Sequence, residues 1–528
     1  MTCKILDAPQ LLDCPDELLL LILEYLDPNS LLHLATLCRR LHLIALPMFF
    51  TRHGMDDPAG NAEFTILDSR KDPLSALQMA LFIPAVTRLS CSWPQTSIHR
   101  LRPHIRRLRV LFTRLAFVRH VTLVLDIPSE FSGATDDDVE AWALELRDLL
   151  NMILKRGCIS LTLRYGHFSK PYQPELRHIP LLIRPVAAFR NVIRHILPAS
   201  VPPVDPSEDR ELLQMGPRAV SMELDSEGRS SSALTQFSIE SPILLLPPCF
   251  DWSLSALRHS PVSRLEFVGI DLPTRIWSVV LPPIAGVTSA LTELNLSNLY
   301  GISGMDILHF LAKLPGLKML TIGYTEFSRS VQSSFPDSGP IPKLHQLTVL
   351  HAPSTFISHM LKKKSLPRLD LLCITPRRLI LGPRGMRHIA RCVAEIVRQL
   401  EKYKLTPTVA LEIQRGQDAD AEMAADLAPP VVAGEHLTKP LRAITRLVVC
   451  SDSEMSADEL GMLARWIARF PAVLHVALRV QDGRGDAWAS IDNARRIARQ
   501  NPNLASVELN GKLFDGEMLL KRELFIYK

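Results

Sequence analysis

The sequence has no apolar run long enough to cross a membrane. Its most apolar run, Leu18 to Leu23, is far shorter than the roughly 20 residues that a membrane-spanning helix needs. The first residues also lack a basic region that leads into an uninterrupted apolar segment, so we expect no secretory signal. These absences predict a soluble protein.

Neither the cysteines nor the net charge indicate a special environment or partner. The nine cysteines are odd in number and scattered, without the paired spacing of a zinc or redox motif. We interpret them as reduced thiols of a protein that is cytoplasmic and/or nuclear. Sixty Lys and Arg against 55 Asp and Glu leave a net charge of +5, which is too small an excess to predict nucleic-acid binding.

Motifs for catalysis are also missing. The sequence contains no P-loop, no G-x-G-x-x-G, no H-E-x-x-H and no His/Cys cluster with metal-ligand spacing. The segment Gly301-Ile302-Ser303-Gly304 resembles a nucleophile elbow, but Met305 stands where the final glycine is needed. His351 and His359 stand alone in the sequence. We therefore expect no enzyme activity, no metal and no cofactor.

One segment, residues 100–111, is strongly basic. Its arginines could contact phosphates, but aromatic residues for base stacking are not interleaved with them. Apolar residues recur at helical spacing, at Leu101, Ile105, Leu108 and Phe112. We therefore favour a helix with a solvated basic face over a nucleic-acid site.

What the sequence does contain is enough apolar residues for a large core. Of its 528 residues, 47% are hydrophobic and 22% are charged, as in ordinary globular proteins. A chain of this length exceeds what a single core usually organises. We expect either several domains or one repetitive domain.

The N-terminal region predicts three short helices. Pro15, followed by two acidic residues, fits the first turn of a helix. Asp27-Pro28 ends this helix, Asn29 or Ser30 can cap a second one, and Cys38 leads into a third.

The first of these helices is apolar nearly all round, with the sequence LLLLILEYL over residues 18–26. Three short helices cannot bury such a surface among themselves. Either the downstream domain or a separate partner therefore covers one face of the helix.

Residues 14–41 read CPDELLLLILEYLDPNSLLHLATLCRRL, which resembles the F-box. That motif usually opens with Leu-Pro-x-Glu-Leu and closes with Val-Cys/Ser-Arg-Arg-Trp. Here Cys14 replaces the first Leu, Leu37 the Val and Leu41 the Trp. We place this F-box module at residues 8–56.

The resemblance implies a Skp-type adaptor as partner and, through it, cullin and RING subunits and a ubiquitin-charged E2. It also implies which residues form or support the adaptor-binding surface. By position in the motif these are Pro15, Leu18, Ile22, Leu26, Leu31, Leu37 and Leu41.

The remainder, residues 57–528, carries a recurring Leu-x-x-Leu-x-Leu phrase preceded by amphipathic segments. Copies begin at Val262, Leu291, Leu317, Leu344, Leu366, Ile444, Val473 and Leu504. Consecutive copies start about 22–31 residues apart, close to the leucine-rich-repeat period of about 20–29 residues. This resembles a divergent leucine-rich-repeat-like α/β solenoid, or horseshoe, that follows the three-helix module.

Other parts of this region fit the pattern less regularly. Residues 88–91, 121–125 and 159–163 read as strands, with a helix from about Thr135 to Lys155 before the last of them. The consensus Asn or Cys after the strand is replaced by Leu299, Thr325 and Ala352. Flexible insertions are expected near 199–236, 328–342 and 415–440, which are rich in Pro, Ser, Gly and charge.

These features predict a non-catalytic substrate-recognition subunit of an SCF-type cullin-RING ubiquitin ligase. The F-box binds the adaptor and the repeats bind a protein target that the sequence does not identify. The alternative is a repeat scaffold outside any ligase, which uses the F-box as a docking module or as a cap.

Overall fold

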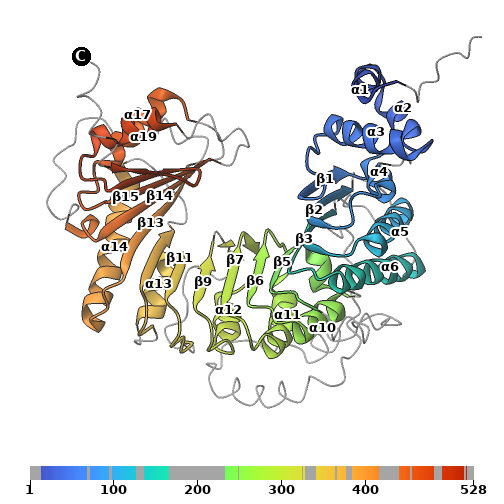
Figure 1. Cartoon of the computed structure of the whole chain (residues 1–528). Helices are drawn as coiled ribbons and strands as arrows, with labels where there is room; N and C mark the ends of the chain where they lie inside the picture. Colours follow the sequence, from blue (N-terminus) through green and yellow to red (C-terminus); the bar gives the residue numbers. More distant parts are fainter. Residues whose placement is uncertain are drawn as a thin grey trace, which may run out of the picture. The chain divides into compact units, whose positions relative to one another are not determined.

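A computed structural model describes residues 14–67, 72–93, 98–125, 136–165, 232–247, 249–323, 325–326, 341–362, 366–375, 383–415, 439–451, 455–480, 490–516 and 519. The fold is mixed α/β: N-terminal helices are followed by strands that alternate with helices (Figure 1). The chain divides into two compact units, Met1–Ile270 and Asp271–Lys528. No helix in the described ranges is both long and apolar enough to span a bilayer.

The three predicted N-terminal helices are present as α1 (Asp16–Glu24), α2 (Pro28–Leu34) and α3 (Arg39–Arg52). Pro15 is the N-cap of α1 and Cys38 is the N-cap of α3. The predicted cap of α2 was wrong, because Asp27 takes that role rather than Asn29 or Ser30. Pro28 then occupies the first helical position, where its missing N–H leaves no hydrogen bond unmade.

Six strands of the first unit pair in parallel and in chain order. They are β1 (Asn61–Thr65), β2 (Val86–Trp93), β3 (Val118–Leu125), β4 (Ser160–Arg164), β5 (Gln236–Glu240) and β6 (Arg264–Val268). The helical segments among them are α4 (Pro73–Met79), α5 (Ile98–Arg114), α6 (Asp136–Lys155), the 3₁₀ turn η2 (Pro242–Leu245) and α10 (Phe250–His259). The strands predicted at 88–91, 121–125 and 159–163 and the helix near 135–155 are confirmed.

The register of these strands places apolar side chains in rows on one face. One row runs through Leu89, Val121, Leu161, Phe237 and Leu265, which are paired from strand to strand and buried. Because side chains alternate along a strand, the next residues fall on the opposite face. We call that opposite face the open face.

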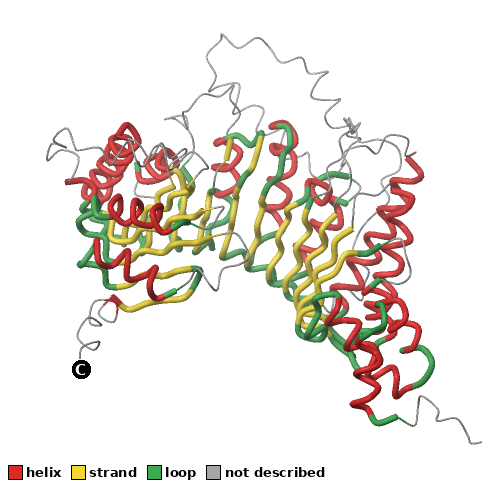
Figure 2. The backbone as a smooth tube through the Cα atoms, turned by 90° about the horizontal axis from the view of Figure 1, so that it is seen from above, coloured by secondary structure: helices red, strands yellow, loops and turns green. Residues whose placement is uncertain are grey.

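The second unit repeats this arrangement, and its strands lie side by side (Figure 2). They are β7 (Glu293–Ser297), β9 (Met319–Ile322), β11 (Val349–Pro353), β12 (Leu371–Thr375), β13 (Thr408–Arg415), β14 (Ile444–Ser451), β15 (His475–Val480), β16 (Ser506–Leu509) and β17 (Lys512–Asp515). Pairing is parallel except between β16 and β17. The helices are α11 (Thr274–Val287), α12 (Gly304–Leu311), α13 (Ser354–Leu361), α14 (Pro383–Tyr403), α17 (Ala457–Ile467) and α19 (Ile491–Gln500).

Two of the predicted repeat phrases were in the wrong frame. Leu350 pairs with Leu320 of the preceding strand and with Leu372 of the next. The phrases predicted to start at Leu344 and Leu366 are therefore each three residues too early in the sequence. Leucines in this part of the sequence fit either frame. Pairing with the neighbouring strands selects the frame that puts Leu350 and Leu372 on the buried face.

The missing consensus Asn after β7 and β9 is compensated by the backbone. The segments β8 (Leu299–Tyr300) and β10 (Thr325–Glu326) pair in parallel, with Thr325 opposite Leu299. Ala352, the third departure, lies within β11 because of the frame displacement. Backbone pairing of β8 with β10 therefore connects the segments that follow β7 and β9, where side chains were expected to make this connection.

Most of the three predicted insertions lies outside the described residues. Among their described residues, 232–235 and 341–342 lie outside helices and strands, and 439–440 are helical. Gln236 begins β5 and Arg415 ends β13. The predicted insertions at 199–236 and 415–440 therefore extended at least one residue into strands.

A buried ion pair joins α4 to α5 in the first unit. The carboxylate of Asp72, which is fully buried, accepts hydrogen bonds from the backbone N–H groups of Leu67 and Ser75. Arg107 Nη2 lies 2.5 Å from Asp72 Oδ1, and its Nη1 donates to the Leu67 carbonyl. One arginine of the basic run thus joins α5 to the N-cap of α4 and to the Leu67 carbonyl.

We expect Asp72→Ala to destabilise the first unit by about 3–5 kcal/mol, because it leaves the partly buried guanidinium of Arg107 and two amides without their acceptor. Urea unfolding followed by far-UV circular dichroism measures the change. As a control, Asp148→Ala removes the ion pairs with Arg109 and Arg147, in which the Asp148 side chain is 40% exposed, and should cost about 1 kcal/mol or less. Equal effects of the two substitutions would contradict the structural role of Asp72.

Candidate functional site

Helix α1 has one buried and one exposed apolar face. Leu19 and Leu23 are fully buried, and α1 packs against α3. The exposed face carries Leu18, Leu21, Ile22 and Tyr25, which we call the α1 stripe; exposure ranges from 43% for Ile22 to 88% for Tyr25. Positions i, i+3, i+4 and i+7 share one side of a helix, so the four side chains form a continuous apolar surface.

Two arginines of α3 hold α1 at both ends. Arg40 binds the first turn of α1, with Nη2 2.6 Å from both Asp16 Oδ1 and the Cys14 carbonyl. Arg52 donates to the last carbonyls of the helix region, those of Leu23, Glu24 and Leu26. A cation at the C-terminal end also complements the helix dipole. These contacts fix the direction in which the α1 stripe faces.

The second helix is oriented by the side chain of Asp27. One carboxylate oxygen accepts from the backbone N–H of Asn29 at 2.9 Å and of Ser30 at 3.2 Å, and the other accepts from the Ser30 hydroxyl at 2.6 Å. The Ser30 hydroxyl and these amides stabilise the ionised carboxylate and lower the pKa of Asp27. The turn between α1 and α2 is therefore fixed at neutral pH.

The seven residues predicted for the adaptor surface occupy three kinds of position. Pro15, Leu18, Ile22 and Leu37 are exposed, and Leu26 is half-buried. Leu31 and Leu41 are buried inside the module. In the structure the last two stabilise the helices, and they do not present their side chains to a partner.

Sequence reasoning missed other exposed apolar residues of the module. Leu21 and Tyr25 complete the α1 stripe, while Leu20 and Leu43 are also about half exposed. The signal for the first two was present in the sequence, because they stand at helical spacing from Leu18. Which face of an all-apolar helix is buried cannot be read from spacing alone.

The basic helix α5 does not present a free row of cations. Arg102 and Arg106 both contact Glu145 of α6, at 3.0 and 2.5 Å, and Arg109 pairs with Asp148 at 3.0 Å. The apolar residues Leu101, Ile105, Leu108 and Phe112 are buried, as predicted. Acidic side chains of α6 thus neutralise much of the charge that could have attracted phosphates.

The motif that resembled a nucleophile elbow has a structural role. Ser303 is the N-cap of α12, where its hydroxyl accepts from the backbone N–H of Asp306 and donates to the carboxylate of the same residue. Burial raises the pKa of Asp306. The Ser303 hydroxyl is engaged by this cap, and we assign it no nucleophilic role.

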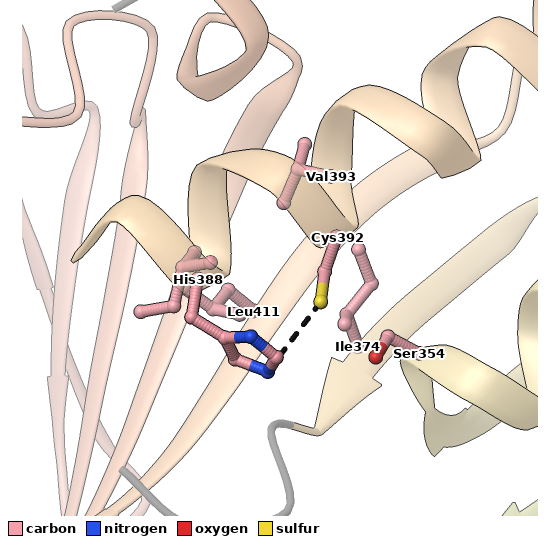
Figure 3. A pocket seen from close by; sticks show the side chains of 7 residues that line it. Ser354, Ile374, His388, Cys392, Val393 and Leu411 are labelled. Atoms are coloured by element: carbon pink, nitrogen blue, oxygen red, sulfur yellow. Dashed lines mark hydrogen bonds between the residues drawn. The ribbon is translucent and has the colours of Figure 1, made fainter. Parts of the chain in front are cut away.

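A small hollow lies between α14 and the ends of strands β12 and β13 (Figure 3). Cys392 and His388 meet there, with Sγ 3.6 Å from Nε2, which resembles a nucleophile and base. However, His388 is exposed and is therefore solvated, whereas a catalytic base is usually oriented by a third group. The hollow has a volume of about 10 Å³, far less than the roughly 300–1,000 Å³ of typical small-molecule sites. We assign no catalytic role to this pair.

The open face of each unit offers a second surface, made mainly of polar residues. In the first unit one row runs through Ser90, Thr122, Thr162, Ser238 and Glu266, paired from strand to strand. Ion pairs link neighbouring positions, as between Arg164 and Glu240 at 3.0 Å. A polar, hydrogen-bonding surface of this kind suits recognition of a protein better than burial in a core.

Comparison with known proteins identifies the N-terminal helices. Residues 11–53 match the F-box-like family model, a range that includes α1, α2 and α3 completely. F-box domains generally bind Skp-type adaptors, so the match suggests a role in adaptor binding for this part of the chain. No curated protein shows significant similarity to the chain.

We expect Arg52→Ala to loosen α1 without unfolding the rest of the chain, because three carbonyls lose their charged donor. With a loss of about 1 kcal/mol, amide hydrogen exchange in α1 should accelerate about fivefold. Mass spectrometry of peptides that cover residues 16–26 measures this change. The neighbouring substitution Arg39→Ala, at an exposed position, is the control, and an equal acceleration there would refute the proposed contact.

Proposed function

We propose that the chain is the substrate-recognition subunit of an SCF-type cullin-RING ubiquitin ligase. In this proposal the F-box module binds a Skp-type adaptor, which links the chain to cullin and RING subunits. The observation that carries the proposal is the α1 stripe, an exposed apolar surface inside a segment that matches the F-box-like family.

The energetics support a partner at this surface. Fully burying a large apolar side chain contributes about 1.5–3 kcal/mol, so the four residues of the α1 stripe could supply most of a moderate binding free energy. Exposed apolar surface that a helix presents continuously usually marks an interaction site. Leu37, 69% exposed, adds a further apolar contact from the segment between α2 and α3.

We further propose that the strand and helix units form a divergent leucine-rich-repeat-like solenoid that binds the protein target. This proposal is supported by the order of the strands, which follows the chain in each unit. Each strand adds apolar residues to the buried face and further residues to the open face. Stacked units of this kind offer an extended surface for recognition. The target would bind the polar open face.

In this proposal the chain is not an enzyme. Ubiquitin transfer occurs on other subunits, and the chain contributes by raising the concentration of its target beside the E2. Such a receptor works in the cytoplasm and/or the nucleus, where its thiols stay reduced.

We expect Ile22→Glu to weaken binding of the full-length chain to a Skp-type adaptor at least about a hundredfold, because the interface would then bury an unpaired carboxylate. Leu18→Glu should have a comparable effect. Isothermal titration calorimetry or surface plasmon resonance with the purified adaptor measures the affinity.

A matched control is Val110→Glu, which places the same charge at an exposed apolar position on α5, outside the F-box-like segment. It should leave adaptor affinity unchanged. Failure of the wild-type chain to bind the adaptor at micromolar concentration would refute the ligase assignment.

The Ile22→Glu substitution also provides a test of target binding. Full-length Ile22→Glu should retain its target but fail to deliver it for ubiquitylation, so proteins that co-purify with the variant should be more abundant than with wild type. Quantitative mass spectrometry compares the two. Equal recovery, with no protein stabilised by the variant, would contradict the receptor role.

The alternative function is a repeat scaffold that uses its F-box as a docking module outside any ligase. The exposed α1 stripe is compatible with this alternative too, because it requires only a partner. Adaptor binding without recruitment of a cullin would favour the scaffold.

A further inference from the structure

Three side chains with metal-binding groups converge on the open face of the second unit. His351 of β11, Cys373 of β12 and Glu412 of β13 bring a ring nitrogen, a thiol sulfur and a carboxylate oxygen within 4.8 Å of one another. They are the one such group of His, Cys, Asp and Glu found in the part of the chain that the structure describes. Each residue comes from a different strand.

Strand register explains why they meet. His351 pairs directly with Cys373, and Cys373 pairs with Ala410. Glu412 lies two residues beyond Ala410 and therefore on the same face. Neighbouring strands are only about 4.8 Å apart, so residues that are far apart in sequence become neighbours. Linear spacing, which predicted no metal site, cannot reveal this arrangement.

The geometry is close to that of a tetrahedral metal site. His351 Nε2 lies 3.2 Å from Glu412 Oε2. Two ligands that bind zinc at about 2.0–2.2 Å with a tetrahedral angle are about 3.3–3.5 Å apart. The imidazole and the carboxylate are therefore already separated by nearly the ligand–ligand distance that zinc requires.

The present contacts do not fully satisfy His351. Its Nε2 is buried, and among the described residues no acceptor meets it with hydrogen-bond geometry, despite the nearby carboxylate. A metal ion bound between the three groups would coordinate this nitrogen and use the same thiol and carboxylate partners.

The charges around the group also fit a divalent ion. One thiolate from Cys373 and one carboxylate from Glu412 neutralise the two charges of Zn²⁺, which matters at a site that is largely buried. Cys450, on the next strand, contacts Glu412.

We propose that His351, Cys373 and Glu412 bind a zinc ion on the open face of β11, β12 and β13, with the fourth position beside the Cys450 thiol. The nitrogen, sulfur and oxygen donors favour Zn²⁺ over Mg²⁺ or Ca²⁺, which prefer oxygen ligands alone. The ion ties three strands together across the open face. This site belongs to the second unit and is independent of the adaptor surface.

The test uses the purified full-length chain, kept reduced and stripped of metal by a chelator. Titration with Co²⁺ should give a thiolate-to-cobalt charge-transfer band and intense visible bands typical of tetrahedral coordination. Zn²⁺ should displace the cobalt with a stoichiometry near one ion per chain. It should also raise the melting temperature of the protein.

Three single variants, Cys373→Ser, His351→Gln and Glu412→Gln, should each lower zinc affinity at least about tenfold, since even outer-shell changes at metal sites cost that much. The control is the double variant His388→Gln with Cys392→Ser, which removes the His and Cys pair on α14 and should leave binding unchanged. Circular dichroism of each variant without metal verifies its folding. Glu412→Gln keeps the side-chain shape, and it tests the site even if the buried Cys373→Ser variant unfolds.

Two results would overturn the proposal. One is the absence of a charge-transfer band in the folded wild-type chain at millimolar Co²⁺. The other is a band that persists in Glu412→Gln and His351→Gln but disappears in the α14 double variant, because this would assign the metal to Cys392 and His388.

Discussion

Each strand of this protein has to bury one face, and no strand or helix can do so without its neighbours. In both units the strands pair in chain order, so each new strand extends the same apolar rows, such as Leu89, Val121, Leu161, Phe237 and Leu265. The helices between strands pack beside one another, as α5 does with α6 and α17 with α19. Successive side chains of a strand point to opposite faces. The polar residues that stand between the apolar ones therefore lie on the other face. The open face is thus a consequence of how the core is built.

The N-terminal module also has apolar surface to bury, but it buries only one of the two apolar faces of α1. Leu19 and Leu23 are buried, while the α1 stripe has similar apolar residues that remain exposed. Arg40 and Arg52 hold the two ends of α1 through charged hydrogen bonds, so the helix cannot rotate to bury the other face. Polar contacts at the helix ends therefore maintain an apolar surface that is available to a partner.

Much of the local structure could be predicted from the sequence. The three N-terminal helices, the strands near 88–91, 121–125 and 159–163, and the helix near 135–155 follow from capping residues and from the periodicity of apolar residues. The frame of the predicted phrases at Leu344 and Leu366 could not be predicted, because leucines three residues apart suit either choice. Only pairing of Leu350 with Leu320 and Leu372 distinguishes them.

The sequence by itself determined the elements, their order and the apolar character of the first helix, since these depend on residues close together along the chain. Tertiary structure decided which side of α1 is exposed, because that depends on where α3 and its arginines lie. It also brought His351, Cys373 and Glu412 together, although each stands alone in the sequence. Hydrogen bonding between parallel strands sets their separation at about 4.8 Å, whatever the length of the chain that connects them.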